Sequence, residues 1–407
     1  MEKDQFRGCL VGGLLGECLC VPLKAYHGIV HKVAQLFVDT RDYRSYREKT
    51  VLTNALGNAL LNDGGYDAVS AARACVEAYY SAHPVIRSAF GKLKDIIHHW
   101  KWSNYNTFDT LPKNIVPKTF LKGYGPAAWI SAYPLYFRHQ TELMIRNVRS
   151  VAELTHPAME AYGACELQAY AIAVALQYPY FTPEQFLDML ITLCDSGINL
   201  QLYQPKLVHL KTLLSEETSV VVKALGNDSA GLEAVPMAIY CVLKGTSLAP
   251  ENAFEATMAL TIRVGGCTDG IATLAGAIAG AWHGLKSIPQ AWLQLCDGYK
   301  NSIMLADKLA EHASNTLTNR EIYDFGNYDT LESRLESFKG WPHLKPSPME
   351  LAGDGFFHFG TQDCVQCYYC NCKLRDFEPL SDPRWDHLCK KHNCPASNGP
   401  DNLYFHL

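Results

Sequence analysis

The chain has 407 residues, of which 48% are hydrophobic, and its formal net charge is −5 at pH 7. That composition is sufficient for two or three globular domains of roughly 150 residues each. The slight acidic balance gives no reason to expect binding to nucleic acid or to an anionic membrane, and we predict neither partner.

The N-terminal segment does not have the pattern of a targeting signal. Cys9–Leu23 is apolar, but it is rich in glycine, contains Glu17 and follows a segment with charges of both signs. It is also too short to span a bilayer. Of the fifteen cysteines, six lie between Cys364 and Cys394, a clustering that favours a metal site over a disulfide framework. We therefore expect a reducing compartment, the cytoplasm, the nucleus or both.

Helical periodicity dominates the first three quarters of the chain. Apolar residues recur at helical spacing in four clear segments: Ala55–Leu61, Ala164–Leu176, Pro183–Leu193 and Ile271–Trp282. Alternating strand patterns are scarce, while glycine and proline mark the breaks between helices. The sequence thus predicts a mainly α domain over residues 1–315.

Several motifs in this domain resemble the ADP-ribosylhydrolase family, in particular its branch that cleaves serine-linked ADP-ribose and poly(ADP-ribose). They are Arg7–Cys18, Leu154–His156, Leu225–Asp228, Glu233–Tyr240 and Gly265–Ala281. The resemblance covers about residues 5–312. It implies an all-helical fold and an activity that cleaves the glycosidic bond of ADP-ribose on protein or polymer.

The resemblance also implies a pair of Mg²⁺ ions, which prefer oxygen ligands. Family members take these ligands from an early Thr-Asp-Asp and a late Asp-x-Asp-Thr. Here the motifs align with Thr50–Thr53 and Cys267–Gly270, and a lysine, Lys24, aligns with the catalytic glutamate. Only Asp269 keeps its carboxylate, so we treat Lys24, Thr50 and Asp269 as remnant positions and expect at best a weak Mg²⁺ site. Nearby Asp42, Glu48 and Asp63 are interpreted as solvated loop charges rather than replacement ligands.

By position in the family pattern, an ADP-ribose ligand would meet a set of residues spread over four segments. They are Tyr124, Gly125, His156, Gly265, Gly266, Thr268 and Asp269. Each also has a structural alternative: Tyr124 as a packing aromatic, His156 as a core or helix-terminal histidine, and the glycine pair as a close helix contact.

The polar segment 316–330 is predicted to be a linker, residues 331–399 a small zinc module, and residues 400–407 a tail. The module contains the spacing Cys367-x2-Cys370-x16-His387-x6-Cys394. A CxxC knuckle followed by a histidine and a cysteine completes the tetrahedron that structural zinc requires. Four protein ligands close the site, so the zinc is expected to stabilise the fold rather than to activate water. The remaining Cys364, Cys372 and Cys389 are expected to be free thiols.

The module resembles the baculovirus inhibitor-of-apoptosis repeat (BIR), an α+β zinc domain. The matching stretches are Arg334–Pro342, Leu351–Phe357 and Leu374–Pro379. The resemblance implies a groove that binds a peptide N-terminus by strand addition, here with Leu374, Asp376 and Ser381. Ser381 stands where the family has a second acid, and Lys390 where it often has an aromatic residue. A purely structural zinc module without a peptide ligand is therefore the alternative.

These features together predict a catalytically degenerate ADP-ribosylhydrolase-like protein. It would act as a binder of ADP-ribose or of ADP-ribosylated protein, or as an adaptor, with a protein or peptide partner on the BIR-like module. One alternative is an active hydrolase with an altered or single-metal site. Another is a protein whose function lies in the zinc module, with the helical domain as its scaffold.

Overall fold

The computed structural model describes residues 2–20, 45–105, 112–321, 328, 330–358, 363–368, 372–377, 381–383 and 386–387. Within these residues the chain forms two compact units, residues 1–314 and 315–407, and each is treated by itself. Among the described helices, none is long and apolar enough to cross a membrane.

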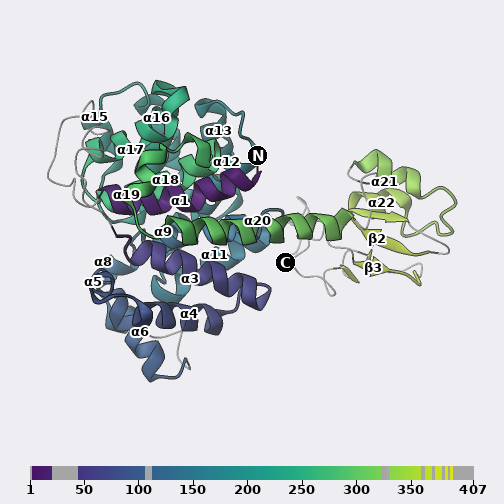
Figure 1. Cartoon of the computed structure of the whole chain (residues 1–407). Helices are drawn as coiled ribbons and strands as arrows, with labels where there is room; N and C mark the ends of the chain where they lie inside the picture. The colour runs from purple at the N-terminus through teal and green to yellow at the C-terminus, as the bar shows by residue number, and fades with distance from the viewer. Residues whose placement is uncertain are drawn as a thin grey trace. The chain divides into compact units, whose positions relative to one another are not determined.

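The first unit consists of helices, which Figure 1 shows in chain order. Its first half contains α1 (Glu2–Cys20), α3 (Glu48–Asp63), α4 (Ala68–Ser81), α5 (Pro84–Ser88), α6 (Leu93–Trp102), α7 (Pro112–Ile115), α8 (Lys118–Leu121), α9 (Gly125–Trp129), α10 (Ala132–Tyr136) and α11 (Thr141–Thr155). Its second half contains α12 (Met159–Gln177), α13 (Pro183–Leu193), α14 (Gln204–Leu213), α15 (Thr218–Leu225), α16 (Gly231–Leu248), α17 (Ala253–Val264), α18 (Thr268–His283), α19 (Gln290–Leu295) and α20 (Tyr299–Glu321).

Helices α1 and α18 lie side by side at the centre of this unit (Figure 1). Glycines on both helices allow the two backbones to touch: a methyl group on Gly12 would lie 2.1 Å from the carbonyl oxygen of Gly276. Gly8 and Gly16 meet α18 in the same way, and each lies four residues from Gly12 and therefore on the same face of α1. This close packing brings the C-terminal end of α1 next to the N-terminal end of α18, where the candidate site lies.

The rest of the core follows from the apolar composition of the neighbouring helices. Nearly every side chain of α18 is buried, and α12, α16 and α17 pack around it. Burial on several faces explains why these helices are apolar without being strongly amphipathic. The predicted mainly α fold of this part of the chain is confirmed.

The second unit is a small α+β module with two short helices, α21 (Leu331–Ser337) and α22 (Pro348–Gly353). Its three strands, β1 (Phe356–His358), β2 (Val365–Cys367) and β3 (Lys373–Leu374), form an antiparallel sheet in the order β1-β2-β3. A small core that includes Phe338, Leu351 and Phe356 lies against this sheet. The prediction of a strand-containing module after the helical domain is confirmed.

Helix α20 continues to Glu321. The first part of the segment 316–330, which the sequence analysis interprets as a linker, is therefore helical. Thr330 then caps α21 through a reciprocal capping box with Ser333.

Candidate functional site

The N-terminus of α3 is capped by a buried carboxylate from α1. Glu17 is fully buried, and its two oxygens accept the backbone N–H groups of Arg47, Lys49 and Thr50 at 2.9–3.1 Å. These donors have no partners within their own helix, and a negative charge is favoured at the positive end of a helix. Glu17 thereby fixes α3 against the end of α1.

The side chain of Lys49 fills the space between α1, α3 and α18. Its ammonium Nζ lies 2.8 Å from Glu48 Oε1, 3.1 Å from Asp269 Oδ2 and 3.7 Å from Glu17 Oε1. The lysine side chain is only 4% exposed, and that of Asp269 only 9%. The three carboxylates thus surround a single buried cation that belongs to the chain itself.

The ammonium stays protonated at neutral pH. Burial acts to lower the pKa of Lys49, but the negative groups around it outweigh this effect and raise its pKa well above the ordinary value. These groups are the phenol of Tyr124, when ionised, and the carboxylates of Glu17, Glu48 and Asp269. The positive ends of α3 and α18 each add roughly half a charge to the same region. Together with Arg47, whose Nε is 4.0 Å from Glu48, they balance the carboxylates.

Two expectations from the sequence require correction here. Glu48 is not a solvated loop charge, because it is the first residue of α3 and pairs with Lys49. Val51 and Leu52 lie within the segment Thr50–Thr53 that resembles the early metal-binding motif, but neither forms the pairs around Asp269: Leu52 lies in the hydrophobic core, and Lys49 pairs with both Glu48 and Asp269.

The three remnant positions therefore differ in their surroundings. Asp269 pairs with Lys49, whereas Thr50 contributes its backbone N–H to Glu17 and is otherwise buried. Lys24 lies outside the described residues. The sequence signal that could have identified the cluster is the Glu48-Lys49 pair at the start of a helix, together with an acid, Glu17, inside an otherwise apolar helix.

Tyr124 precedes α9 and lies against α18 beside this cluster. A methyl group on Gly270 would be 2.2 Å from its phenol, so the absence of a side chain there is what admits the ring. Its hydroxyl accepts a hydrogen bond from Cys267 Sγ at 3.4 Å. Burial raises the pKa of Tyr124 well above the ordinary value despite the nearby Lys49 ammonium, so the phenol is neutral at pH 7.

His156, at the end of α11, is a buried neutral histidine. Burial lowers the pKa of His156 to about 3. Its Nδ1 lies 2.8 Å from Thr155 Oγ1, and its ring packs on Phe120 with the centroids 4.3 Å apart. Its Nε2 faces Gly125, where a methyl group would be only 3.1 Å away. The structure thus brings two of the predicted ligand residues, Gly125 and His156, into contact.

The glycine pair between α17 and α18 is held against another loop. Gly265 and Gly266 both have positive φ angles, and a methyl group on Gly266 would lie 2.1 Å from the carbonyl oxygen of Asn227. The same oxygen accepts the N–H of Cys267 at 2.7 Å. Thr268 begins α18 and is almost fully buried. The turn that positions Asp269 is therefore built on contacts with Asn227, a residue without an assigned role in the sequence analysis.

Two of the four predicted zinc ligands fall within the described residues. Cys367 ends β2 and His387 lies near the end of the described chain, and both are fully buried; Cys370 and Cys394 lie outside the described residues. The backbone N–H of Cys367 donates to the carbonyl of Cys372 at 2.8 Å, which joins the end of β2 to the residue before β3. Across the described ranges no group of three His, Cys, Asp or Glu side chains forms a metal-binding cluster. A buried thiol and a buried imidazole are suitable zinc donors.

The three residues predicted to line a peptide groove lie on or after β3, an edge strand of the described sheet. Leu374 is buried on this strand, Asp376 has a φ of 61°, and Ser381 is half-buried. Asp363, which the sequence analysis does not single out, accepts the N–H groups of Asp376 at 3.2 Å and Phe377 at 2.7 Å. These hydrogen bonds hold the backbone that follows β3.

Comparison with known proteins agrees with both units. The family model described as ADP-ribosylglycohydrolase matches residues 1–318, and the model of the Inhibitor of Apoptosis domain, the BIR, matches residues 334–398. ADP-ribosylhydrolase ARH3 of Bos taurus is 30% identical over 340 residues, covering 75% of this chain and 92% of that protein. The human ARH3 is 29% identical over 352 residues, covering 75% and 93%.

Two further similarities concern one unit each. Baculoviral IAP repeat-containing protein 3 of Canis lupus familiaris is 41% identical over 68 residues, which are 17% of this chain and 11% of that protein. A solved chain titled ADP-ribosylglycohydrolase-related protein complex superimposes with a TM-score of 0.51 at 17% identity, covering 76% of this chain and 98% of the other, and supports the fold alone.

The family model and the ARH3 relatives both cover the helical unit, which therefore defines a protein of the ADP-ribosylhydrolase class. The chain belongs to the ADP-ribosylglycohydrolase family and carries a BIR domain after its helical unit.

Proposed function

We propose that this protein is a non-hydrolysing member of its family that acts as a binder of ADP-ribosylated protein or as an adaptor. In this proposal the helical unit recognises an ADP-ribose-related group without cleaving it. The BIR domain engages a second protein or peptide. The observation that carries the proposal is the ammonium of Lys49 among the carboxylates of Glu17, Glu48 and Asp269.

The described residues do not fit a magnesium ion at this cluster. Mg²⁺ needs oxygen ligands at 2.0–2.1 Å in near-octahedral geometry. The oxygens that could supply them already lie 2.8 and 3.1 Å from the Lys49 nitrogen. A divalent ion sharing those oxygens would stand within a few ångströms of a fixed positive charge in a buried site, where repulsion is strong. No metal-dependent step is therefore assigned to this cluster.

The same cluster offers no acid or base for glycosidic cleavage. Such chemistry generally uses a pair of carboxyl groups, one to protonate the leaving oxygen and one to activate water or attack the sugar. Here Glu17 is committed to three backbone N–H groups, and Asp269 is ion-paired. Tyr124 is neutral and buried next to them. The Lys49 cluster thus favours a structural role.

The BIR domain supports the adaptor half of the proposal. The residues that fit a structural zinc are Cys367 and His387, and the resemblance adds Cys370 and Cys394. An edge strand such as β3 can accept an extended peptide by strand addition. Zinc would hold this small module folded, since its own hydrophobic core is limited.

The test is a calorimetric titration of the full chain with ADP-ribose, with and without Mg²⁺, alongside an assay for release of ADP-ribose from a serine-modified peptide. We expect no release and an ADP-ribose affinity that Mg²⁺ does not change. An active ARH3 serves as the positive control for the peptide. Release that requires Mg²⁺ and is abolished by Asp269→Ala would overturn the proposal in favour of an active hydrolase.

Absence of ADP-ribose binding under both conditions would restrict the proposal to the adaptor role. A peptide-binding assay with the full chain and its Cys367→Ser variant then decides whether that role depends on the BIR domain. Circular dichroism at 222 nm controls for the integrity of the helical unit in that variant.

A further inference from the structure

A small cavity lies where α1, α3, α18 and α20 meet, one helical turn beyond the Lys49 cluster. Its volume is about 10 Å³, which is enough for a water molecule and far too small for an organic ligand. Five hydroxyl side chains line it, and each is at most 9% exposed; they are Thr50, Thr53, Ser131, Thr273 and Ser302. The cavity is therefore a polar space in the interior of the helical unit.

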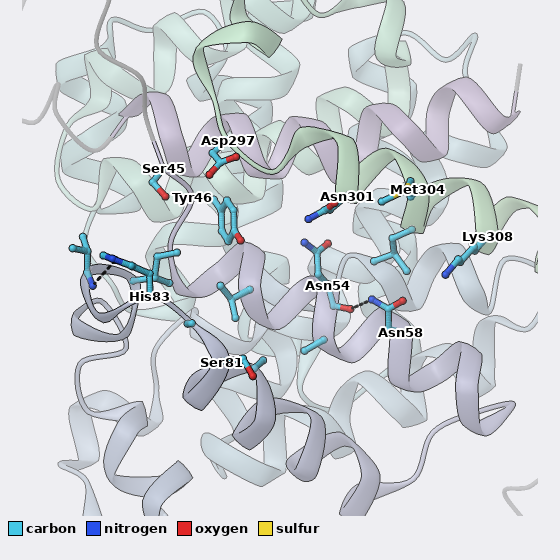
Figure 2. A pocket seen from close by; sticks show the side chains of 17 residues that line it. Ser45, Tyr46, Asn54, Asn58, Ser81, His83, Asp297, Asn301, Met304 and Lys308 are labelled. Atoms are coloured by element: carbon cyan, nitrogen blue, oxygen red, sulfur yellow. Dashed lines mark hydrogen bonds between the residues drawn. The ribbon is translucent and has the colours of Figure 1, made fainter.

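This cavity differs from the open groove that Figure 2 shows between α3 and α20. Asn301, which lines the groove, is exposed, whereas the next residue, Ser302, is buried and lines the cavity. Asn54 lines both, but its Oδ1 atom is sealed from either space. The hydroxyls are therefore the groups that can bind a molecule in the cavity.

Two of these hydroxyls have already placed their hydrogen. Thr53 Oγ1 donates to the backbone oxygen of Lys49 at 2.9 Å, and Thr273 Oγ1 donates to that of Asp269 at 2.7 Å. A hydroxyl oxygen that donates its hydrogen still has lone pairs. Thr53 and Thr273 thus offer acceptors to the cavity, from the two helices that carry the ion cluster.

The other three hydroxyls, those of Thr50, Ser131 and Ser302, form no hydrogen bond with another residue in the part of the chain that the structure describes. Their oxygens are not among the sealed, unpaired atoms of the described residues, so each keeps surface that a water can reach. Buried hydroxyls in native proteins nearly always have a partner, which here is a molecule in the cavity.

The lining distinguishes between classes of occupant. Among the described residues that line the cavity none is charged, whereas bound Mg²⁺ or Ca²⁺ is usually held by carboxylates. The positive ends of α3 and α18 disfavour a cation there, and the carboxylates of the Lys49 cluster disfavour an anion. An apolar atom would leave the hydroxyls unpaired. A water molecule has two donors and two acceptors, and the five hydroxyls match both.

A second cavity in the same unit provides an internal comparison. Its volume is also about 10 Å³, but its lining is almost entirely apolar and includes Leu52, Leu56, Leu93, Ile97 and Trp100. Apolar cavities in proteins stay dry and take up xenon. The two cavities thus have the same size and opposite chemistry.

We propose that the hydroxyl-lined cavity binds one long-lived internal water, which joins α3, α18 and α20 behind the ion cluster. The water donates to the oxygens of Thr53 and Thr273. It accepts from the hydroxyls of Thr50, Ser131 and Ser302, two at a time. This site does not depend on ADP-ribose recognition, and it fixes α20 to the two helices on which the cluster is built.

The test is nuclear Overhauser transfer from water to ¹³C-labelled threonine methyl groups in the full chain. Thr257 on α17 is the matched control, because it is fully buried and its hydroxyl donates to the backbone oxygen of Ala253 at 2.8 Å, yet it lines neither cavity. We expect the transfer to the Thr273 methyl to be at least fivefold stronger than that to the Thr257 methyl.

Xenon and a triple variant make the test specific. Under xenon pressure the labelled methyl signals of Leu56 and Ile97 should shift, and that of Thr273 should not. The variant Thr50→Val/Ser131→Ala/Ser302→Ala removes the three donors. Its water transfer to Thr273 should fall at least fivefold, and xenon should then shift the Thr273 signal. Unchanged Thr257 and Ile97 signals in this variant verify its fold.

Equal water transfer to Thr273 and Thr257 in the wild type would overturn the proposal, as would a xenon shift at Thr273. A Thr273 signal that moves when Na⁺ replaces K⁺ in the buffer would also overturn it, in favour of a bound cation. If the triple variant does not fold, the comparison of Thr273 with Thr257 in the wild type decides alone.

Discussion

Replacing Lys49 by methionine tests the ion cluster directly, because methionine has a similar shape and no charge. The pair between Lys49 and Asp269 at 3.1 Å has a Coulomb energy of about 5 kcal/mol at an effective dielectric constant of about 20. Part of that is offset by desolvation, since both side chains are less than a tenth exposed. Removing one partner of a buried pair leaves the other unpaired, so we expect Lys49→Met to lower the free energy of unfolding by about 3–5 kcal/mol.

The assay is urea unfolding followed at 222 nm, which reports the helical unit, as a double-mutant cycle with Asp269→Asn. If the two side chains interact as the structure has them, the double variant should be more stable than the sum of the single effects predicts, by about 2 kcal/mol. Lys122→Met serves as the control, since the Lys122–Glu160 pair is at 2.7 Å but its lysine is 56% exposed; its loss should cost at most about 1 kcal/mol.

The dependence on pH gives a second readout of the same cluster. Because the pKa of Lys49 is raised in the folded protein, its contribution is fully present below the unfolded-state value of about 10.4 and is lost only as the pH rises above it. The loss of unfolding free energy in the Lys49→Met variant should therefore not change between pH 7 and pH 9. Two results would refute the structural role of the ammonium. One is a loss of unfolding free energy in Lys49→Met below about 1 kcal/mol at pH 7. The other is additive effects of Lys49→Met and Asp269→Asn in the double-mutant cycle.

Three further predictions follow from the packing and the metal module. Burial lowers the pKa of His156 to about 3, so below pH 6.5 the folded protein binds fewer protons than the unfolded one and the wild type loses stability. The His156→Gln variant lacks this loss. Its free energy of unfolding, measured with urea, should therefore rise relative to that of the wild type by about 3 kcal/mol between pH 7 and pH 4. Gly12→Ala places a methyl group 2.1 Å from a backbone oxygen of α18 and should lower the free energy of unfolding by about 3 kcal/mol. Its control, Gly13→Ala, meets only an ordinary 3.6 Å contact and should be neutral or stabilising by up to about 1 kcal/mol. Equal effects of the two variants would contradict the α1–α18 packing. The purified chain should contain zinc, measured by plasma mass spectrometry, and the Cys367→Ser variant should lack it. In that variant the loss of protease resistance should be confined to residues after 330. A zinc content unaffected by Cys367→Ser would rule out this ligand set.

The sequence was sufficient for the fold class because that information is local. Helical spacing of apolar residues, such as Ile271–Trp282, and the scarcity of alternating segments predict helices without reference to distant parts of the chain. The glycines of Arg7–Cys18 and Gly265–Ala281 were likewise visible as motifs. The CxxC spacing at Cys367 was specific enough to suggest a zinc module because ligand geometry restricts the spacing along the chain.

The site was not determined in this way, because it depends on atoms that are distant in sequence. Glu17, Lys49 and Asp269 are spread over some 250 residues, and only the close packing of α1 on α18 brings them together. The resemblance alone gives no sign of this cluster, because Glu48 and Lys49 lie just before the segment Thr50–Thr53 that resembles the family motif. In the folded protein burial decides the outcome, because three carboxylates in a site of low dielectric require a cation nearby. Among the described residues, the ammonium of Lys49 lies within 4.0 Å of all three.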